Sequence, residues 1–133
     1  MARPKKASEH QEQVTLFKWA EIQKAAHPEL ALLHAIPNGG HRSKVAGAKM
    51  KAEGVKRGVP DICLPVPRGE WHGLYIEMKT RTGTTSEEQR WWLAELQKRG
   101  YRVAICRSWS AARDFIVDYL KQEKDYGGNS KAA

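Results

Sequence analysis

Hydrophobic and polar residues follow one another along this chain with two periodicities, one typical of helices and one typical of strands. Four segments have helical character, at residues 8–26, 43–53, 86–99 and 110–120. Ser8 is a suitable N-cap for the first helix, which ends at His27-Pro28 because a residue before proline disfavours the helical conformation. The third helix opens with Ser86-Glu87-Glu88-Gln89, which has the spacing of a capping box. Gly54 and Gly100 are placed to end the second and third helices.

Shorter apolar runs between these segments predict four strands. Residues 30–36 suit a buried strand that ends at the turn sequence Pro37-Asn38-Gly39-Gly40. Residues 61–66 and 73–79 flank a second turn sequence and predict a hairpin, and residues 101–106 form the last strand. The predicted order is helix, strand, helix, strand, strand, helix, strand, helix. This order indicates an α/β fold, with a small mixed central sheet flanked by helices.

The length of 133 residues fits one domain, which we place at residues 8–121. Residues 1–7 form a basic tail without the apolar stretch of a secretory signal, and residues 122–133 are expected to be a disordered tail. No apolar run approaches the roughly 20 residues that span a membrane. Cys63 and Cys106 lie in strand-like runs without zinc-type spacing, so we expect buried free thiols in a reducing cytoplasm.

Positive charge is concentrated in one part of the chain. The formal net charge is +8, and residues 40–57 hold six basic residues against a single acid, Glu53. The six are Arg42, Lys44, Lys49, Lys51, Lys56 and Arg57. Such a cluster is an electrostatic footprint for a polyanion such as a nucleic acid, although a solvated basic face has the same composition.

One predicted strand carries charged residues, although its other side chains suit the protein interior. In residues 74–79, side chains alternate between two faces, so Leu74, Ile76 and Met78 form an apolar face. Glu77 and Lys79 share the opposite face with Tyr75. A lone Glu-x-Lys pair is usually a solvent-facing ion pair, and further residues are needed to indicate chemistry.

A further acidic residue that indicates chemistry lies before the strand of residues 74–79. Asp61 follows Pro60 at the start of the preceding strand, where a hairpin would bring it beside Glu77. Two converging carboxylates can hold a divalent hard cation, Mg²⁺ or Mn²⁺. Such a cation lowers the pKa of water and stabilises charge on a phosphate oxygen, while a neighbouring lysine can polarise the attacking water. Together these parts predict phosphodiester hydrolysis.

The motif Pro60-Asp61 followed by Glu77-Met78-Lys79 resembles the PD-(D/E)xK nuclease superfamily, and its surroundings resemble the VRR-NUC branch. The resemblance covers roughly residues 8–120 and rests on five ordered blocks at residues 37–42, 54–62, 73–79, 86–89 and 100–103. It implies a restriction-endonuclease-like core. It also implies that Asp61, Glu77 and the Met78 carbonyl bind the metal and that Lys79 is the catalytic lysine.

The resemblance further implies an acid on the first helix. Glu9 is preferred, because Glu9 and Gln13 match the family's Glu-x-x-x-Gln spacing, but Glu12 remains open and either acid also suits a helix start. Gln89 is similar to a family glutamine that reaches the active site, and its capping role is the alternative.

Other side chains are candidates for contacts with DNA. Six of them are expected to bind it: Asn38, His41, Arg42, Lys44, Lys56 and Arg57. For His41, an exposed loop position without a role is an equal interpretation. Trp91 and Trp92 favour core packing, although one of them is also a candidate for a dimer contact or for stacking on DNA.

The resemblance implies a stand-alone endonuclease of bacterial or phage type, acting in the host cytoplasm as a homodimer on branched DNA such as four-way junctions. A 5′-flap nuclease or a non-catalytic DNA-binding module are the alternatives. A His-Asn-His site at His34, Asn38 and His41 is disfavoured by its spacing, and no Gly-rich phosphate loop is present in the sequence.

Overall fold

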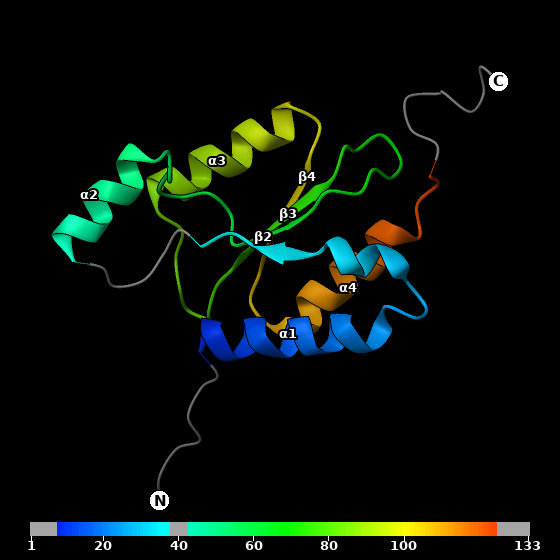
Figure 1. Ribbon diagram of the computed structural model, residues 1–133. Coiled ribbons are helices and arrows are strands. Elements are labelled where there is room, and N and C mark those ends of the chain that lie inside the picture. The colour runs from blue at the N-terminus through cyan, green and yellow to red at the C-terminus, as the bar shows by residue number, and fades with distance from the viewer. Residues whose placement is uncertain (1–7, 38–42, 125–133) are drawn as a thin grey trace, which may run out of the picture.

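A mixed sheet lies at the centre of the described part of the chain, residues 8–37 and 43–124 of a computed structural model (Figure 1). Its strand order is β1-β2-β3-β4. The strands are β1 (His34–Ala35), β2 (Ile62–Leu64), β3 (Leu74–Met78) and β4 (Arg102–Cys106). The helices are α1 (Glu9–Gln23), α2 (Lys44–Ala52), α3 (Glu87–Lys98) and α4 (Trp109–Leu120), with a short 3₁₀ helix, η1 (Pro28–Leu32). The predicted order of elements is confirmed, with η1 as an addition.

The predicted hairpin is present. β2 and β3 pair antiparallel, with Ile62 opposite Ile76 and Leu64 opposite Leu74. Continuing this register by one residue sets Asp61 opposite Glu77. β4 pairs with β3 in parallel, and α3 supplies the crossover connection that a parallel pair requires.

The prediction of a buried strand over residues 30–36 is wrong for most of its length. Residues 28–32 form η1, and only His34–Ala35 pairs with β2, as an exposed edge strand. Leu30 and Leu33 are buried three residues apart, which is the period of a 3₁₀ turn and not of a strand. Pro28 adds a fixed φ that suits the first helical position.

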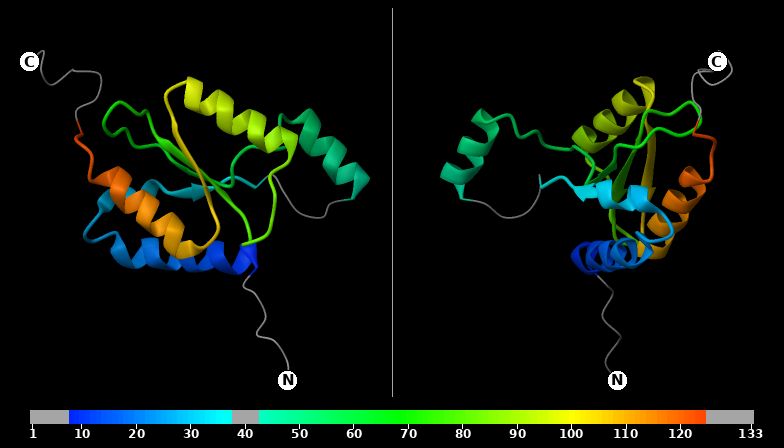
Figure 2. Two further views of the ribbon diagram at one scale, coloured as in Figure 1. Left: turned by 180° about the vertical axis from the view of Figure 1, so that it is seen from behind. Right: turned by 45° about the vertical axis from the view of Figure 1, so that its right-hand side comes forward.

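Two layers of helices enclose the sheet. α1 and α4 pack together against one face, and α3 lies on the opposite face (Figure 2). Leu74, Ile76 and Met78 of β3 belong to one core cluster with Leu16 of α1 and Ile116 of α4, so the predicted apolar face is confirmed. The other face of β3 is also covered, which leaves Glu77 only 2% exposed.

The starts of the helices follow the prediction with one exception, whereas α1 ends at Gln23, three residues before its predicted end. Ser8 and Ser86 each complete a capping box, with Gln11 and Gln89 respectively. Gly54 follows α2 with a φ of +99°, where glycine avoids the steric strain of other residues. The exception is α4, which begins at Trp109 with Ser108 as its N-cap and not at Ser110. Both cysteines are free and buried, as expected.

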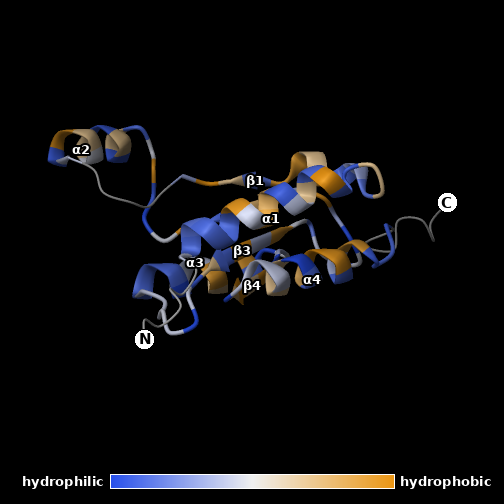
Figure 3. Ribbon diagram, turned by 90° about the horizontal axis from the view of Figure 1, so that it is seen from below, coloured by the Kyte–Doolittle hydropathy of each residue, from blue (hydrophilic) through white to orange (hydrophobic). Residues whose placement is uncertain are grey.

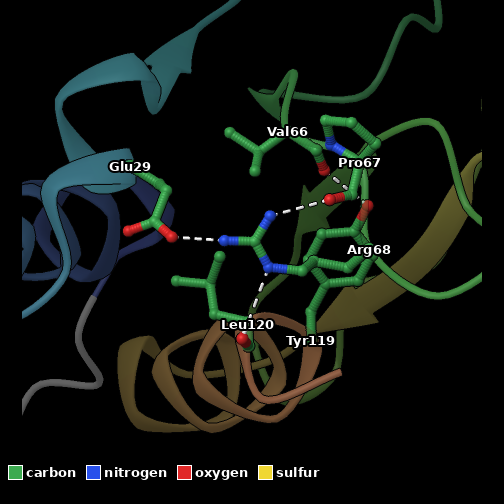
Figure 4. Close-up of polar contacts among 6 residues, drawn as sticks. All are labelled: Glu29, Val66, Pro67, Arg68, Tyr119 and Leu120. Carbon is green, nitrogen blue, oxygen red and sulfur yellow. Dashed lines mark hydrogen bonds and ion pairs between the residues drawn. The ribbon is translucent and has the colours of Figure 1, made fainter. Parts of the chain in front are cut away.

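A buried arginine joins three elements away from the site (Figure 4). Arg68, in the turn between β2 and β3, is 5% exposed and donates a hydrogen bond from Nη2 to the carboxylate of Glu29 in η1. Its remaining donors reach the carbonyls of Pro67 at 2.8 Å and of Leu120, at the end of α4, at 3.4 Å. The guanidinium therefore satisfies backbone groups and a carboxylate that the fold would otherwise leave unpaired.

α2 stands apart from the rest of the fold (Figure 3). None of its residues is buried. No helix within residues 8–37 and 43–124 has the length and apolar character needed to cross a membrane.

Candidate active site

Asp61 directly precedes β2 and is fixed there by hydrogen bonds on both its backbone and its side chain. Its carbonyl accepts the Ile36 N–H at 2.7 Å, which extends the pairing of β1 with β2. Its Oδ2 accepts the Met78 N–H at 2.8 Å. The carboxylate is thereby directed across the hairpin towards the last residues of β3.

Glu77 faces Asp61 from β3 and is buried. Its Oε2 accepts a hydrogen bond from the Gln89 amide at 3.2 Å. Its Oε1 has no hydrogen-bond partner among the described residues, although it is buried. An unsatisfied buried polar atom costs about 1–3 kcal/mol, so this oxygen favours a ligand that could supply positive charge.

The surroundings of Glu77 change the pKa of its carboxyl group. Burial, followed by the negative charge of the nearby Asp61, raises the pKa of Glu77 to about 9. Within this value, the ammonium of Lys79 lowers the pKa, and the charge of Glu9 makes a smaller contribution that raises it. The pair of carboxyl groups consequently retains a proton at neutral pH when no cation is bound.

The two candidate acids of α1 have different positions. Glu12 Oε1 accepts the backbone N–H of Trp109 at 2.9 Å and so caps the start of α4. Glu9 lines a cavity of about 320 Å³ together with Asp61 and Glu77. Glu9 and Gln13 also line a larger neighbouring cavity of about 860 Å³. This geometry favours Glu9 as the acid of the site and gives Glu12 a role in the fold.

Gln89 fills both of the roles considered for it. Its Oε1 accepts the Ser86 N–H at 2.9 Å, which closes the capping box of α3. Its Nε2 donates to Glu77 Oε2. The start of α3 is therefore joined directly to the buried carboxyl group.

Lys79 follows the last residue of β3. Its backbone N–H donates to the Cys106 carbonyl at 3.0 Å, which extends the pairing of β3 with β4. Sequence analysis missed Arg107, whose Nη1 donates to the carbonyls of Thr80 at 2.8 Å and Gly83 at 2.7 Å. Arg107 thus holds the loop after Lys79, and its only sequence signal is its position at the end of a strand.

The remaining wall of the smaller cavity comes from the segment before Asp61 and the start of α3. Arg57 and Gly58 line it beside Glu88, another residue that sequence analysis missed. Gly58 has a φ of +90°, and a Cβ there would lie 2.6 Å from the backbone carbon of Glu88. Only glycine allows this turn to touch α3 so closely.

The predicted DNA contacts are only partly brought to the site. Arg57 lines the cavity, whereas Lys44 and Lys56 are exposed, Lys44 as the first residue of α2. Asn38, His41 and Arg42 lie outside the described residues.

The donor set fits a hard divalent cation. Asp61 and Glu77 supply carboxylate oxygens, one of them buried without a partner, and the Met78 peptide adjoins them through its N–H. Within the described ranges no three His, Cys, Asp or Glu side chains form a complete metal cage. Mg²⁺ does not need one, since it keeps several waters and commonly binds one or two carboxylates.

Comparison with known proteins places this chain in a family. The family model described as "VRR-NUC domain" matches residues 5–109, which include the predicted site residues. A solved structure described as "VRR_NUC domain protein" is 28% identical to this chain, with a TM-score of 0.80. The match covers 94% of this chain and 97% of that one. No curated protein matches the chain.

Proposed function

Because this chain belongs to the VRR-NUC domain family of nucleases, we propose that it is a Mg²⁺- or Mn²⁺-dependent endodeoxyribonuclease acting on branched DNA. One observation supports this above all others. The carboxyl groups of Asp61 and Glu77 converge in a cavity, beside Lys79, with one buried oxygen left without a partner. A cation bound between the two acids would supply the partner that this oxygen lacks.

Asp61, Glu77 and the Met78 carbonyl would hold the cation, with Glu9 lining the same cavity. When bound, the cation supplies positive charge that acidifies water and stabilises the developing charge on phosphate. Gln89 keeps the Glu77 carboxylate in one orientation, because its amide is itself fixed by the Ser86 N–H. The carboxylates thus need little reorganisation when substrate arrives.

Lys79 contributes an ammonium group next to the carboxylates. In hydrolysis, a water oxygen attacks phosphorus, the phosphodiester P–O bond breaks, and the departing oxygen takes up a proton. The ammonium of Lys79 positions this water and offsets the extra negative charge of the pentavalent transition state. Arg107 restricts the loop behind it and so limits the positions that the lysine can adopt.

Positive charge outside the cavity favours DNA as the substrate. Arg57 lies at the cavity wall, and its forked donors suit a phosphate. Lys44 and Lys56 are exposed on α2 and the segment that follows it. We propose a homodimer in a bacterial or phage-infected cell, because two-fold symmetry suits the paired opposed cuts that a four-way junction requires.

Cleavage of four matched labelled DNAs tests the proposal: single strand, duplex, 5′-flap and immobile four-way junction. Each is incubated with Mg²⁺, Mn²⁺ or EDTA. Lys79→Ala removes the proposed catalytic ammonium, and Lys24→Ala removes a positive charge at the far end of α1 as the matched control.

We expect paired, symmetric, metal-dependent cuts in the junction, lost in Lys79→Ala and kept in Lys24→Ala. Cutting confined to the flap would replace the junction by the flap as substrate. Binding without cutting under either metal would refute catalysis and leave a DNA-binding module.

A further inference from the structure

An exposed tryptophan lies on α3 close to the candidate active site. Trp91 is 59% exposed, although a side chain of its size normally loses most of its surface in a fold. The ring of Trp92 meets it edge-on, with 5.6 Å between centroids and an angle of 90° between the planes. The neighbouring ring restricts the orientation of Trp91, so a flat apolar face is presented with little freedom left to lose on binding.

The surroundings of Trp91 suit a neutral flat ligand. Trp91 and Trp92 line a cavity of about 550 Å³. Its other lining residues are Arg57, Glu87, Glu88 and Arg90. These four charges cancel formally, so the cavity does not select for an anion such as phosphate. A planar heterocycle with polar edges matches an aromatic wall surrounded by both acidic and basic groups.

This cavity adjoins the candidate active site. Arg57 and Glu88 line both cavities. The close approach of Gly58 to the backbone of Glu88 keeps the Arg57 segment against the first turn of α3. The same helix places Gln89 on Glu77, two residues before Trp91. Because Arg57 and Glu88 border both cavities, a ligand at Trp91 would lie beside the cavity that holds the carboxylates.

We propose that Trp91 stacks on one unpaired nucleobase of the DNA, adjacent to the phosphate at the carboxylate cluster. This inference rests on the proposed function, because it requires that the chain binds DNA. In a duplex, both faces of each base are covered by neighbouring bases, so only an unpaired or extruded nucleotide offers a free face. Trp91 then gives the protein a preference for DNA in which a nucleotide is unpaired, or is extruded at a branch point, beside the position of cutting.

The test measures binding in EDTA, so that no cleavage is needed. The DNAs are a plain duplex and the same duplex with one unpaired 2-aminopurine, whose fluorescence falls when it stacks on an aromatic ring. Trp91→Ala removes the ring and Trp91→Phe keeps a smaller one. Ile22→Ala is the matched control, because Ile22 is 74% exposed on α1, 13 residues beyond Glu9.

We expect the wild type to quench 2-aminopurine, Trp91→Phe to quench it in part, and Trp91→Ala not at all. Affinity of Trp91→Ala for the unpaired DNA should fall about 5- to 100-fold, the range for one aromatic stack, with duplex affinity unchanged. Equal binding by wild type and Trp91→Ala, or an equal loss on both DNAs, would overturn the inference. So would a change from dimer to monomer in Trp91→Ala, which would identify Trp91 as a subunit contact.

Failure of the stacking site and failure of the nuclease give different results. Loss of cleavage in Lys79→Ala together with normal base binding in Trp91→Ala would retain the nuclease and reject the stacking site. Quenching that depends on Trp91 without cleavage would retain the site and reject catalysis. Absence of any DNA binding by the wild type would reject both.

Discussion

Replacement of Glu77 by glutamine should stabilise the metal-free protein, although it removes a residue of the proposed active site. The amide has the shape of the carboxyl group but no charge. Glu77 is 2% exposed, with a pKa raised to about 9 by burial and by Asp61, whereas the unfolded chain has the ordinary value of 4.5. Between these two pH values the folded state holds a proton that the unfolded state has lost.

The sign and size of the effect follow from proton linkage. Because the folded state binds more protons, its stability falls as pH rises, by about 1.4 kcal/mol for each pH unit. At pH 7 this amounts to about 3 kcal/mol relative to a variant whose side chain does not titrate. Glu77→Gln and wild type should therefore differ little near pH 4.5 and diverge steadily up to pH 9.

Urea unfolding in EDTA at several pH values between 5 and 8 measures this difference directly. Glu53→Gln, which removes an exposed carboxylate at the end of α2, is the matched control. The reasoning fails if Glu77→Gln has the same pH slope as wild type, or if its advantage shrinks as pH rises. Either result would mean that the buried carboxyl group finds a partner in solution.

Three further predictions concern metal binding, the capping box of α3 and the buried Arg68. In a thermal melt, saturating Mg²⁺ should raise the melting temperature of the wild type but not that of Asp61→Asn. At a concentration 100 times the dissociation constant, bound Mg²⁺ stabilises the folded state by about 3 kcal/mol. Ser86→Ala and Gln89→Ala should each lower the free energy of unfolding in urea by about 1 kcal/mol, because each variant breaks the capping box. Of these two residues only Gln89 donates a hydrogen bond to Glu77, so only Gln89→Ala should also lower kcat. Arg68→Ala should cost roughly 1–3 kcal/mol in urea unfolding, because the carbonyls of Pro67 and Leu120 lose their donor. DNA binding should change little, and an unchanged stability would contradict this.

The sequence predicted those features whose causes are local. Alternation within residues 74–79 was sufficient to separate the core-facing side chains from Glu77, and the turn before Gly73 was sufficient to predict a hairpin. Capping residues predicted the start of two helices, since a cap is a contact between residues three apart. A run of leucines near residue 30 was ambiguous, because a strand and a 3₁₀ turn can both bury such residues.

Features that depend on distant residues could not be obtained in this way. Glu9 and Glu12 stand less than one helical turn apart, and both open α1. What distinguishes them is the start of α4, where Trp109, 97 residues after Glu12, presents its N–H. The burial of Glu77 likewise depends on α3 covering that face of the sheet. The role of Arg107 depends on a loop 24–27 residues earlier.

The rigidity of the site and its electrostatic conflict have a common origin. Asp61 is held by hydrogen bonds at its carbonyl and at Oδ2, and Glu77 is held by Gln89, so the two acids cannot move apart to reduce their repulsion. Only a proton or a cation can relieve it, and the two compete for the same oxygens. Metal affinity should therefore rise with pH until the proton of Glu77 is lost. The repulsion between the two acids destabilises the metal-free fold locally. A bound cation removes this repulsion, so the same arrangement strengthens binding of the cation that the proposed chemistry requires.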